Sequence, residues 1–259
     1  MSDIEMSSQE KSCQVMRSAD VVAQIRYLES RQKTPLVHDP YAHLFISDEG
    51  DYLLQCALEK HPYFAKYLMV RERYFDLQLE NVFLDQICQQ LVILGSGNDM
   101  RALRLGFLKK HKIFEVDFSE QIQSKQSILK KVFGKVPQQV VYVEDDVTRP
   151  GLVGRLQQAG FDPGKRAVFL LQGLLYYLTP PGVDTLFEEL MQIPEQGNVV
   201  LLDQITPDMG KEDIYPEDVQ TYLLAQGYAI SDSRLLGDLT QYYYHKKNDT
   251  RWWVISAVR

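Results

Sequence analysis

The sequence predicts an α/β fold with a mostly parallel sheet, a helical N-terminal extension and an antiparallel hairpin at the C-terminus. Three observations support this prediction. The first ninety residues carry apolar side chains at helical spacing. Five short apolar runs then alternate with helical segments of about ten residues, a rhythm typical of parallel βαβ units. The C-terminal end is rich in aromatic and β-branched side chains, which favour strands.

Helices are expected throughout the N-terminal part. Apolar residues recur at helical spacing from Ala19 to Arg31. A new element begins at Asp39-Pro40, since Asp is a common cap and Pro is tolerated in a first helical turn. Pro62 to Gln90 then forms one long pattern without Gly or internal Pro. We therefore expect residues 1–90 to be a helical extension or lid, of which residues 1–17 form a mobile tail.

The five apolar runs are expected to be parallel strands, at residues 91–94, 112–116, 140–143, 167–171 and 199–202. Helices are expected between them, at residues 100–110, 118–132, 152–159 and 183–192. Leu239 to Tyr244 and Trp252 to Val258, separated by a polar stretch, are expected to form the hairpin at the sheet edge and to complete seven strands. Residues 91–259 are then the α/β core of a single domain spanning 1–259.

Composition and charge restrict the function classes. The chain has 45% apolar and 24% charged residues, close to the average of soluble globular proteins. Its net charge of −7 argues against a general nucleic-acid-binding protein, so a nucleic-acid partner is not expected. No apolar run reaches the roughly 18 residues of a membrane span, so no membrane partner is expected.

Cysteine and histidine usage points away from disulfides and metals. Cys13, Cys56 and Cys88 are an odd number, far apart, with no C-x-x-C pair. Together with a polar N-terminus that lacks the features of a secretion signal, they predict a reducing, cytoplasmic location. The five histidines show no H-E-x-x-H pattern, and we expect no metal site.

Polar and glycine residues follow the first three predicted strands, where an open parallel sheet binds its ligands. Gly95 and Gly97 permit a tight turn and close approach of a ligand; the alternative is a tight turn without a ligand. Asp117, about twenty residues later, suits ribose hydroxyls, or else is a capping or solvated acid. The acidic cluster 144–146 suits an adenine amino group, or else is a solvated loop.

Their combination at successive strand ends predicts a ligand that contains adenosine. The sequence has no third phosphate-binding glycine at this turn and no P-loop lysine. S-adenosylmethionine (AdoMet) is therefore favoured over NAD or ATP as the cofactor. Its amino-acid carboxylate would require a guanidinium group. Arg71 and Arg73 lie two apart on a predicted helix, so one of them is expected to face the site, and Arg26 is a further candidate. For each arginine the alternative is an ordinary surface charge.

Seven stretches over about residues 20–200 carry a more specific signal. They are Arg26-Tyr-Leu-Glu29, His38-Asp-Pro-Tyr41, Val70-Arg-Glu-Arg-Tyr-Phe-Asp76, Val92-Ile-Leu-Gly-Ser-Gly-Asn-Asp-Met-Arg101, Phe114-Glu-Val-Asp117 with Lys125 after it, Asp146-Val147, and Gly173-Leu-Leu-Tyr-Tyr-Leu178. In this order they resemble the leucine carboxyl methyltransferase family of class I AdoMet-dependent methyltransferases. The resemblance implies a Rossmann-like class I methyltransferase fold.

The resemblance also implies roles for single residues. Arg71 would hold the methionyl carboxylate with help from Arg26. Gly95 and Gly97 would let the methionine moiety lie against the backbone. Asp117 would bind the ribose, and Asp146 with the backbone of Val147 would meet the adenine. The family usually has Glu where this chain has Gln172, near the cofactor's ammonium group. The lost charge is expected to weaken AdoMet binding by about 1 kcal/mol, or roughly five-fold.

These residues predict an AdoMet-dependent O-methyltransferase that acts on a carboxylate or hydroxyl of a small molecule or a protein C-terminus. A carboxylate acceptor is ionised at neutral pH and needs no general base, whereas a hydroxyl does. The sequence shows no obvious base; His38, His43 and Tyr177 are weak candidates, and Tyr177 otherwise packs in the core.

Two other function classes stay open. One is a catalytically idle AdoMet-binding scaffold, which Gln172 motivates and in which a restored Glu would tighten cofactor binding without turnover. The other is a nucleotide-dependent oxidoreductase that binds NAD. Tyr215, Tyr222 and Tyr228 either line an acceptor pocket or pack between helices.

Overall fold

The structure, a computed structural model, describes residues 8–205, 214–245 and 252–259, and its side chains from Ser18 onward. The described strands are β1 (Gln90–Leu94), β2 (Lys112–Asp117), β3 (Val140–Glu144), β4 (Ala167–Leu171), β5 (Val199–Ile205), β6 (Ala229–Leu235) and β7 (Trp252–Val258). The helices among the same residues are α1 (Ser8–Ser30), α2 (Asp48–Lys60), α3 (Phe64–Leu84), α4 (Arg101–Arg104), α5 (Ser119–Phe133), α6 (Leu152–Gln158), α7 (Pro180–Met191), α8 (Val219–Ala225) and α9 (Leu236–Tyr244), with 3₁₀ turns η1 (Ala42–Phe45), η2 (Gly106–Lys110) and η3 (Leu175–Tyr177).

The seven described strands form one sheet in the order β3-β2-β1-β4-β5-β7-β6. Strands β1 to β5 are parallel, and β7 runs antiparallel to both of its neighbours. All five predicted parallel strands are confirmed, with boundaries that differ by at most three residues. The strand order reverses between β1 and β4, which is where open α/β sheets form their ligand crevice. This is the class I methyltransferase fold.

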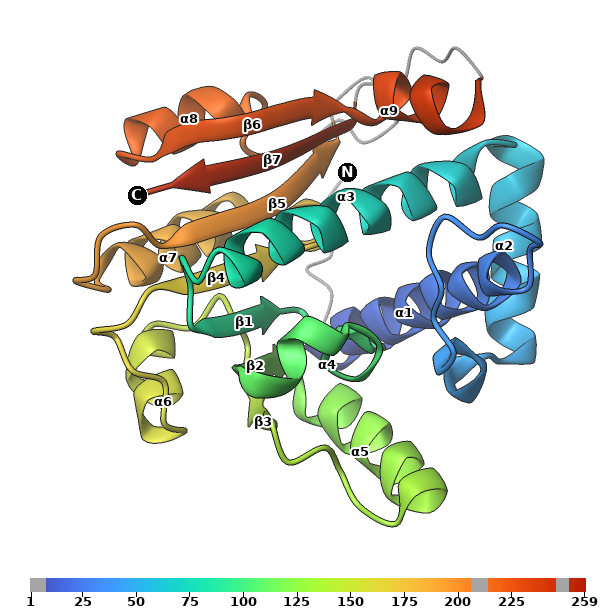
Figure 1. Ribbon diagram of the computed structural model, residues 1–259, viewed down its shortest axis with the longest axis horizontal. Coiled ribbons are helices and arrows are strands. Elements are labelled where there is room, and N and C mark those ends of the chain that lie inside the picture. Colours follow the sequence, from blue (N-terminus) through green and yellow to red (C-terminus); the bar gives the residue numbers. More distant parts are fainter. Residues whose placement is uncertain (1–7, 206–213, 246–251) are drawn as a thin grey trace, which may run out of the picture.

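The parallel strands are buried on both faces, as continuous apolar runs require. Leu91 and Ile93 of β1 belong to a core cluster shared with α3. Val92 and Leu94, which point to the other face, belong to a second cluster shared with α6 and α7. Figure 1 shows α3 running along the sheet, with α1 and α2 beyond the arrowheads of β1 and β5. The N-terminal helices therefore lie beyond the carboxyl ends of the parallel strands (Figure 1).

The predicted C-terminal hairpin is wrong in one strand. Leu239 to Tyr244 belongs to helix α9, and the true partner of β7 is β6. Leu236 and Thr240, four residues apart, are fully buried on one face of α9, whereas Tyr242 points to solvent. This helical spacing outweighs the strand preference of the aromatic residues. The β6 strand escaped prediction because, as an edge strand, it carries few apolar side chains.

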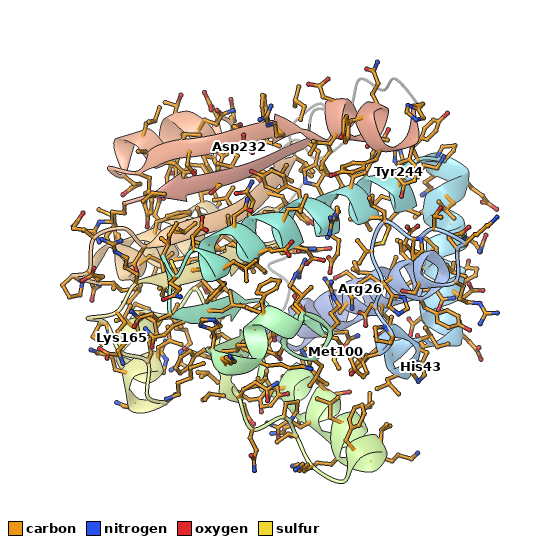
Figure 2. All side chains as sticks on the ribbon, in the orientation of Figure 1. Arg26, His43, Met100, Lys165, Asp232 and Tyr244 are labelled. Atoms are coloured by element: carbon orange, nitrogen blue, oxygen red, sulfur yellow. The ribbon has the colours of Figure 1, made fainter. Side chains whose placement is uncertain are left out.

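Helix α9 packs beside α3, and Figure 2 shows Tyr244 at its end. The Lys66 ammonium on α3 lies 5.2 Å from the centre of the Tyr244 ring. The expected mobile tail is corrected in part, since residues 8–17 belong to α1, while residues 1–7 lie outside the described chain. Among the described residues, no helix is both long and apolar enough to cross a membrane.

The Ser47 side chain connects the start of α2 to α1 through hydrogen bonds. The Ser47 hydroxyl accepts a hydrogen bond from the Gly50 backbone N–H at 3.0 Å, which caps α2. The same hydroxyl donates to Asp20 Oδ2 at 3.0 Å. Asp20 in turn accepts from Asn98 Nδ2 at 3.0 Å, so the cap connects both helices to the loop after β1.

We predict that Ser47→Ala lowers the free energy of unfolding by about 1–2 kcal/mol, because it removes a helix cap and a bond between helices. Urea unfolding followed by circular dichroism measures this change. Ser127→Ala, on the exposed side of α5, is the matched control and should change the value by less than about 0.5 kcal/mol. Equal effects of both substitutions would contradict the role given to Ser47.

Candidate functional site

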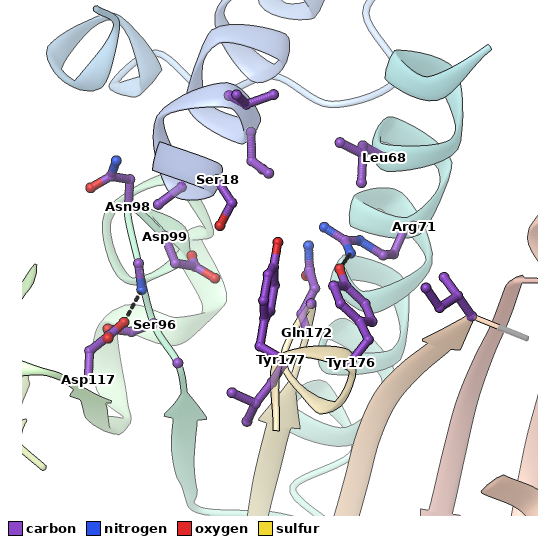
Figure 3. A pocket seen from close by; sticks show the side chains of 18 of the residues that line it. Ser18, Leu68, Arg71, Ser96, Asn98, Asp99, Asp117, Gln172, Tyr176 and Tyr177 are labelled. Carbon is purple, nitrogen blue, oxygen red and sulfur yellow. Dashed lines mark hydrogen bonds between the residues drawn. The ribbon is translucent and has the colours of Figure 1, made fainter. Parts of the chain in front are cut away.

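A cavity of about 1310 Å³ lies between the strand ends and the N-terminal helices. Its walls come from α1, the end of α2, the start of α3, the loops after β1 to β4, η3 and the first residue of β7. Figure 3 shows this cavity with Asp117 and Asn98 on one side and Arg71 and Leu68 on the other. This volume exceeds the roughly 300–1,000 Å³ of an ordinary ligand pocket, so the cavity has room for more than one small molecule.

The glycine turn after β1 lines this cavity. Gly95 and Gly97 have φ angles of +66° and +47°, in the left-handed region that favours glycine. A Cβ atom at Gly97 would lie 3.2 Å from Cβ of Ala19, and one at Gly95 would lie 3.0 Å from Cδ1 of Leu174. Both glycines are thus required by the turn itself and by the close approach of neighbouring elements.

Asp117, at the end of β2, is almost fully buried in the cavity wall. Its Oδ2 accepts from the Gly97 N–H at 2.7 Å and its Oδ1 from the Phe118 N–H at 2.8 Å. Burial raises the pKa of Asp117, and the two N–H donors offset only part of this rise. The carboxylate therefore connects the glycine turn to β2 and presents its remaining lone pairs to the cavity.

Of the three acidic residues at the end of β3, two line the cavity and one is exposed on the surface. Asp145, Asp146 and Val147 line the cavity. Asp146 Oδ1 accepts from both the backbone N–H and the hydroxyl of Thr148, at 2.9 and 2.7 Å. Glu144 is exposed and accepts instead from the Ser119 hydroxyl at 2.6 Å. The predicted acidic cluster thus contributes two of its three carboxylates to the cavity wall.

Five charged residues form what we call the α3–α4 ion cluster: Glu72, Asp76, Asp99, Arg101 and Arg104. Arg101 pairs with Asp99, with Asp76 at 2.8 Å and with Glu72 at 3.1 Å. Arg104 pairs with Asp76 at 2.6 Å and Glu72 at 2.8 Å. Burial raises the pKa of Glu72, but the adjacent guanidinium groups, Arg101 foremost, outweigh it and hold this pKa far below its ordinary value.

Gln172, just after β4, joins the α3–α4 ion cluster to the cavity, which it lines. Its Nε2 donates to Glu72 Oε2 at 2.7 Å, while its Oε1 accepts from Arg101 Nη2 at 2.6 Å. An amide makes both bonds, whereas a carboxylate could not donate to Glu72. The family's usual Glu would carry a negative charge at position 172. In this chain a negative charge lies one hydrogen bond away, on Glu72.

The three candidate arginines differ in their positions. Arg71 lines the cavity, and its Nη1 donates to Asp203 Oδ2 at 3.0 Å. Arg26 also lines it, pairing with Asp39 at 2.9 Å and donating to the Asn98 carbonyl at 2.6 Å. Arg73 is not among the described lining residues, so Arg71 is the member of this pair that faces the cavity. Two residues apart on α3, Arg71 and Arg73 cannot face the same side.

Among the candidate bases, Tyr177 lines the cavity and points into it from η3 (Figure 3). His38 and His43 are not among the described lining residues, whereas His61, which the sequence did not single out, is. Its position between two predicted helices was a weak signal. Among the described residues, no group of three His, Cys, Asp or Glu side chains could hold a metal ion.

The three tyrosines considered for an acceptor pocket are not among the described lining residues; Tyr228 is buried in the core, and Tyr215 and Tyr222 are partly buried against it. The hydroxyls of Tyr215 and Tyr222 both donate to Asp184 Oδ1 at 2.9 Å. The rings of Tyr222 and Tyr228 lie edge-on to Phe187, with centroids 5.3 and 6.2 Å away. The packing alternative is therefore confirmed for them.

The sequence matches the family model of leucine carboxyl methyltransferase over residues 19–191. Two Mycobacteroides abscessus proteins named "Putative S-adenosyl-L-methionine-dependent methyltransferase" are 32% and 29% identical over 71% and 93% of this chain. A Mycobacterium tuberculosis protein of the same name is 31% identical over 68% of this chain. The alignments span 65%, 83% and 61% of the three relatives' own lengths, so the chain spans less than two thirds of two of them.

Solved structures agree with the fold. A Thermobifida fusca protein superposes with a TM-score of 0.65 at 12% identity, covering 93% of each chain. A DUF574 family protein from Streptomyces avermitilis gives the same TM-score at 9% identity, covering 93% of this chain and 97% of its own. At such low identity these similarities concern the fold alone.

The hydrogen bond between Gln172 and Glu72 should contribute to the free energy of unfolding. Gln172→Glu would place two carboxylates at hydrogen-bond distance, which disfavours ionisation of one of them. We expect the free energy of unfolding to fall by about 1–3 kcal/mol at about pH 8. The folded variant would hold the shared proton more tightly than the unfolded chain, whose Glu pKa is about 4.3, so the loss should shrink as the pH falls.

Urea unfolding of the variant and the wild type at about pH 8 and about pH 5.5 measures this difference. The swap variant Glu72→Gln/Gln172→Glu is the matched control, because it restores one carboxylate and one amide. It should recover most of the lost stability. A Gln172→Glu protein as stable as the wild type at the higher pH would refute the described arrangement.

Proposed function

We propose, since the chain belongs to the leucine carboxyl methyltransferase family, that it transfers the methyl group of AdoMet to a carboxylate oxygen of an acceptor with an apolar body. The observation that carries this proposal is that one cavity is lined by residues at the carboxyl ends of three different strands, namely Gly95, Gly97, Asp117 and Asp146. The acceptor is a small molecule or a protein C-terminus.

The lining residues support one orientation of the cofactor. The Asp117 carboxylate already accepts from two backbone N–H groups, and its remaining lone pairs would accept hydrogen bonds from the ribose hydroxyls. Asp146 and Val147 would contact the adenine, one strand further along. The methionine moiety would then lie along the glycine turn towards Gln172, with its carboxylate at Arg71. Arg26 would act indirectly, because its guanidinium holds the Asn98 carbonyl behind this turn.

The remaining wall favours an apolar acceptor that carries negative charge. Leu53, Phe64 and Leu68 line the cavity from α2 and α3. None of the acidic residues described in the lining comes from these two helices, whereas the cationic residue Lys60, at the end of α2, belongs to the lining. Positive charge at the acceptor side raises the local concentration of an anionic substrate. A carboxylic acid with an apolar body fits this wall.

Methyl transfer to a carboxylate needs positioning more than proton chemistry. The carboxylate oxygen attacks the methyl carbon, the carbon–sulfur bond breaks, and the sulfur keeps the electron pair. The products are a methyl ester and S-adenosylhomocysteine, and no proton moves. The protein's task is to hold the oxygen in line with the carbon–sulfur bond at about 3 Å. Tyr177 points into the cavity (Figure 3), and its hydroxyl would orient the attacking carboxylate.

A hydroxyl acceptor is the second candidate, and the presence of His61 in the cavity lining favours it. A hydroxyl must lose its proton as the bond to carbon forms, and a neutral imidazole can take that proton. The two candidates differ in the product: one gives a methyl ester and the other a methyl ether.

For the cofactor, we predict that Asp117→Asn weakens binding of S-adenosylhomocysteine by about tenfold or more, because a charged acceptor of ribose hydrogen bonds is lost. Titration calorimetry measures this affinity. Glu144→Gln is the matched control, since Glu144 is likewise the last residue of a strand but lies outside the cavity lining. Wild-type affinity in both variants would argue against Asp117 as the ribose ligand.

For the acceptor, we predict that methyl-labelled AdoMet transfers label to carboxylic acids with apolar bodies and not to matched phenols or alcohols. The product should release labelled methanol in mild alkali, as methyl esters do. His61→Gln should retain this activity. Alkali-stable label that disappears in His61→Gln would identify a hydroxyl acceptor, and a folded, cofactor-binding protein without any transfer would favour the idle scaffold.

A further inference from the structure

Two of the residues that contact Arg71, Asp203 and Trp252, lie outside the matched family segment, which ends at residue 191. Its described hydrogen bonds all use one nitrogen: Nη1 donates to Asp203 Oδ2 at 3.0 Å and to the Tyr176 hydroxyl at 3.1 Å. Its Nε is buried and has no hydrogen-bond partner among the described residues. Among the described residues, no hydrogen bond uses the edge formed by Nε and Nη2, whose parallel N–H groups suit a carboxylate.

Asp203 is fully buried and bound by three donors. Besides Arg71, it accepts from the Trp252 indole N–H at 2.8 Å and from the Gly173 backbone N–H at 2.6 Å. A buried carboxylate with this many donors has little freedom to turn. The position of its Oδ2 therefore fixes the position of Arg71 Nη1.

Besides binding Asp203, Trp252 contacts Arg71 itself. The guanidinium carbon of Arg71 lies 5.1 Å from the centre of the Trp252 ring, within the range of cation–π attraction. Antiparallel pairing of β5 with β7 places Trp252 opposite Ile205, two residues from Asp203. The indole thus covers the guanidinium while its N–H holds Asp203. Trp252 also lines the cavity, and Figure 3 shows the Arg71 guanidinium next to Tyr176 there.

We propose that Asp203 and Trp252 are positioning residues, which hold the Arg71 guanidinium so that its Nε–Nη2 edge receives the amino-acid carboxylate of the cofactor. This inference rests on the proposed orientation of AdoMet. It assigns a binding role to the antiparallel end of the sheet, because β7 supplies Trp252.

The test compares two ligands that share the adenosine and thioether but differ in the amino-acid moiety. S-adenosylhomocysteine carries the carboxylate, and 5′-methylthioadenosine does not. Trp252→Phe keeps an aromatic ring but removes the N–H that Asp203 accepts. We expect it to raise the Kd of S-adenosylhomocysteine about tenfold and to leave that of 5′-methylthioadenosine unchanged. An unchanged Kd for the first ligand, or an equal loss for both, would overturn the proposal.

Trp253→Phe is the matched control, because Trp253 is the neighbouring residue and is not among the described cavity lining. It should leave both affinities unchanged. Arg71→Gln tests whether Trp252 acts through Arg71: the Trp252→Phe change should add no further loss in that background. Additive losses would show that Trp252 acts independently and would overturn the positioning role.

Two measurements keep the proposal testable if Trp252→Phe does not fold. Asp203→Asn should weaken S-adenosylhomocysteine alone; tighter binding would show that Asp203 only competes for the charge of Arg71. In Trp253→Phe, Trp252 is the single tryptophan left in the chain. Its fluorescence should change with S-adenosylhomocysteine, and an unchanged signal would count against the proposal. A wild-type protein that binds neither ligand would refute the cofactor orientation itself.

Discussion

The buried ion pairs between α3 and the loop and short helix after β1 are the constraint on which the rest of the site depends. Arg101, nearly inaccessible to solvent, is bound by carboxylates from α3 and from its own loop, and by the Gln172 amide after β4. Buried charges are tolerated only when they are paired, and removal of one partner leaves the other uncompensated. The pairs therefore fix α3 against β1 and β4 at the point where the strand order reverses. This fixed position of α3 brings Arg71 to the cavity.

The cavity has two chemically different sides because two kinds of chain segment enclose it. The loops after β1, β2 and β3 supply acidic side chains next to a glycine turn, which suits a nucleoside with hydroxyl and amino groups. The end of α2 and the start of α3 supply apolar and aromatic side chains, with Lys60 and His61 between them. Chemistry that needs a bound cofactor and a less polar acceptor is consistent with this division.

At Gln172 the sequence pattern and the structure lead to different conclusions. Compared with the family pattern it is a lost charge, and that loss motivates the idle-scaffold alternative. In the structure its amide lies between Glu72 and Arg101 and satisfies both. A second carboxylate there would face Glu72 directly. The residue is thus compatible with a working cofactor site, because the charge belongs to the cluster rather than to one position.

The sequence by itself determined the five parallel strands, the glycine turn and the acids at the ends of β2 and β3, because short apolar runs and the residues that end them are local patterns. Only the tertiary structure decided which arginine faces the cavity, that residues 239–244 form a helix, and that Asp203 and Trp252 hold Arg71. These outcomes depend on side chains that are far apart in the sequence: Arg71 and Asp203 are separated by 132 positions, and Asp203 and Trp252 by 49. Charge pairing and burial across that separation have no signature in local sequence, since any carboxylate could meet any arginine until the packing of α3 on the sheet selects the pair.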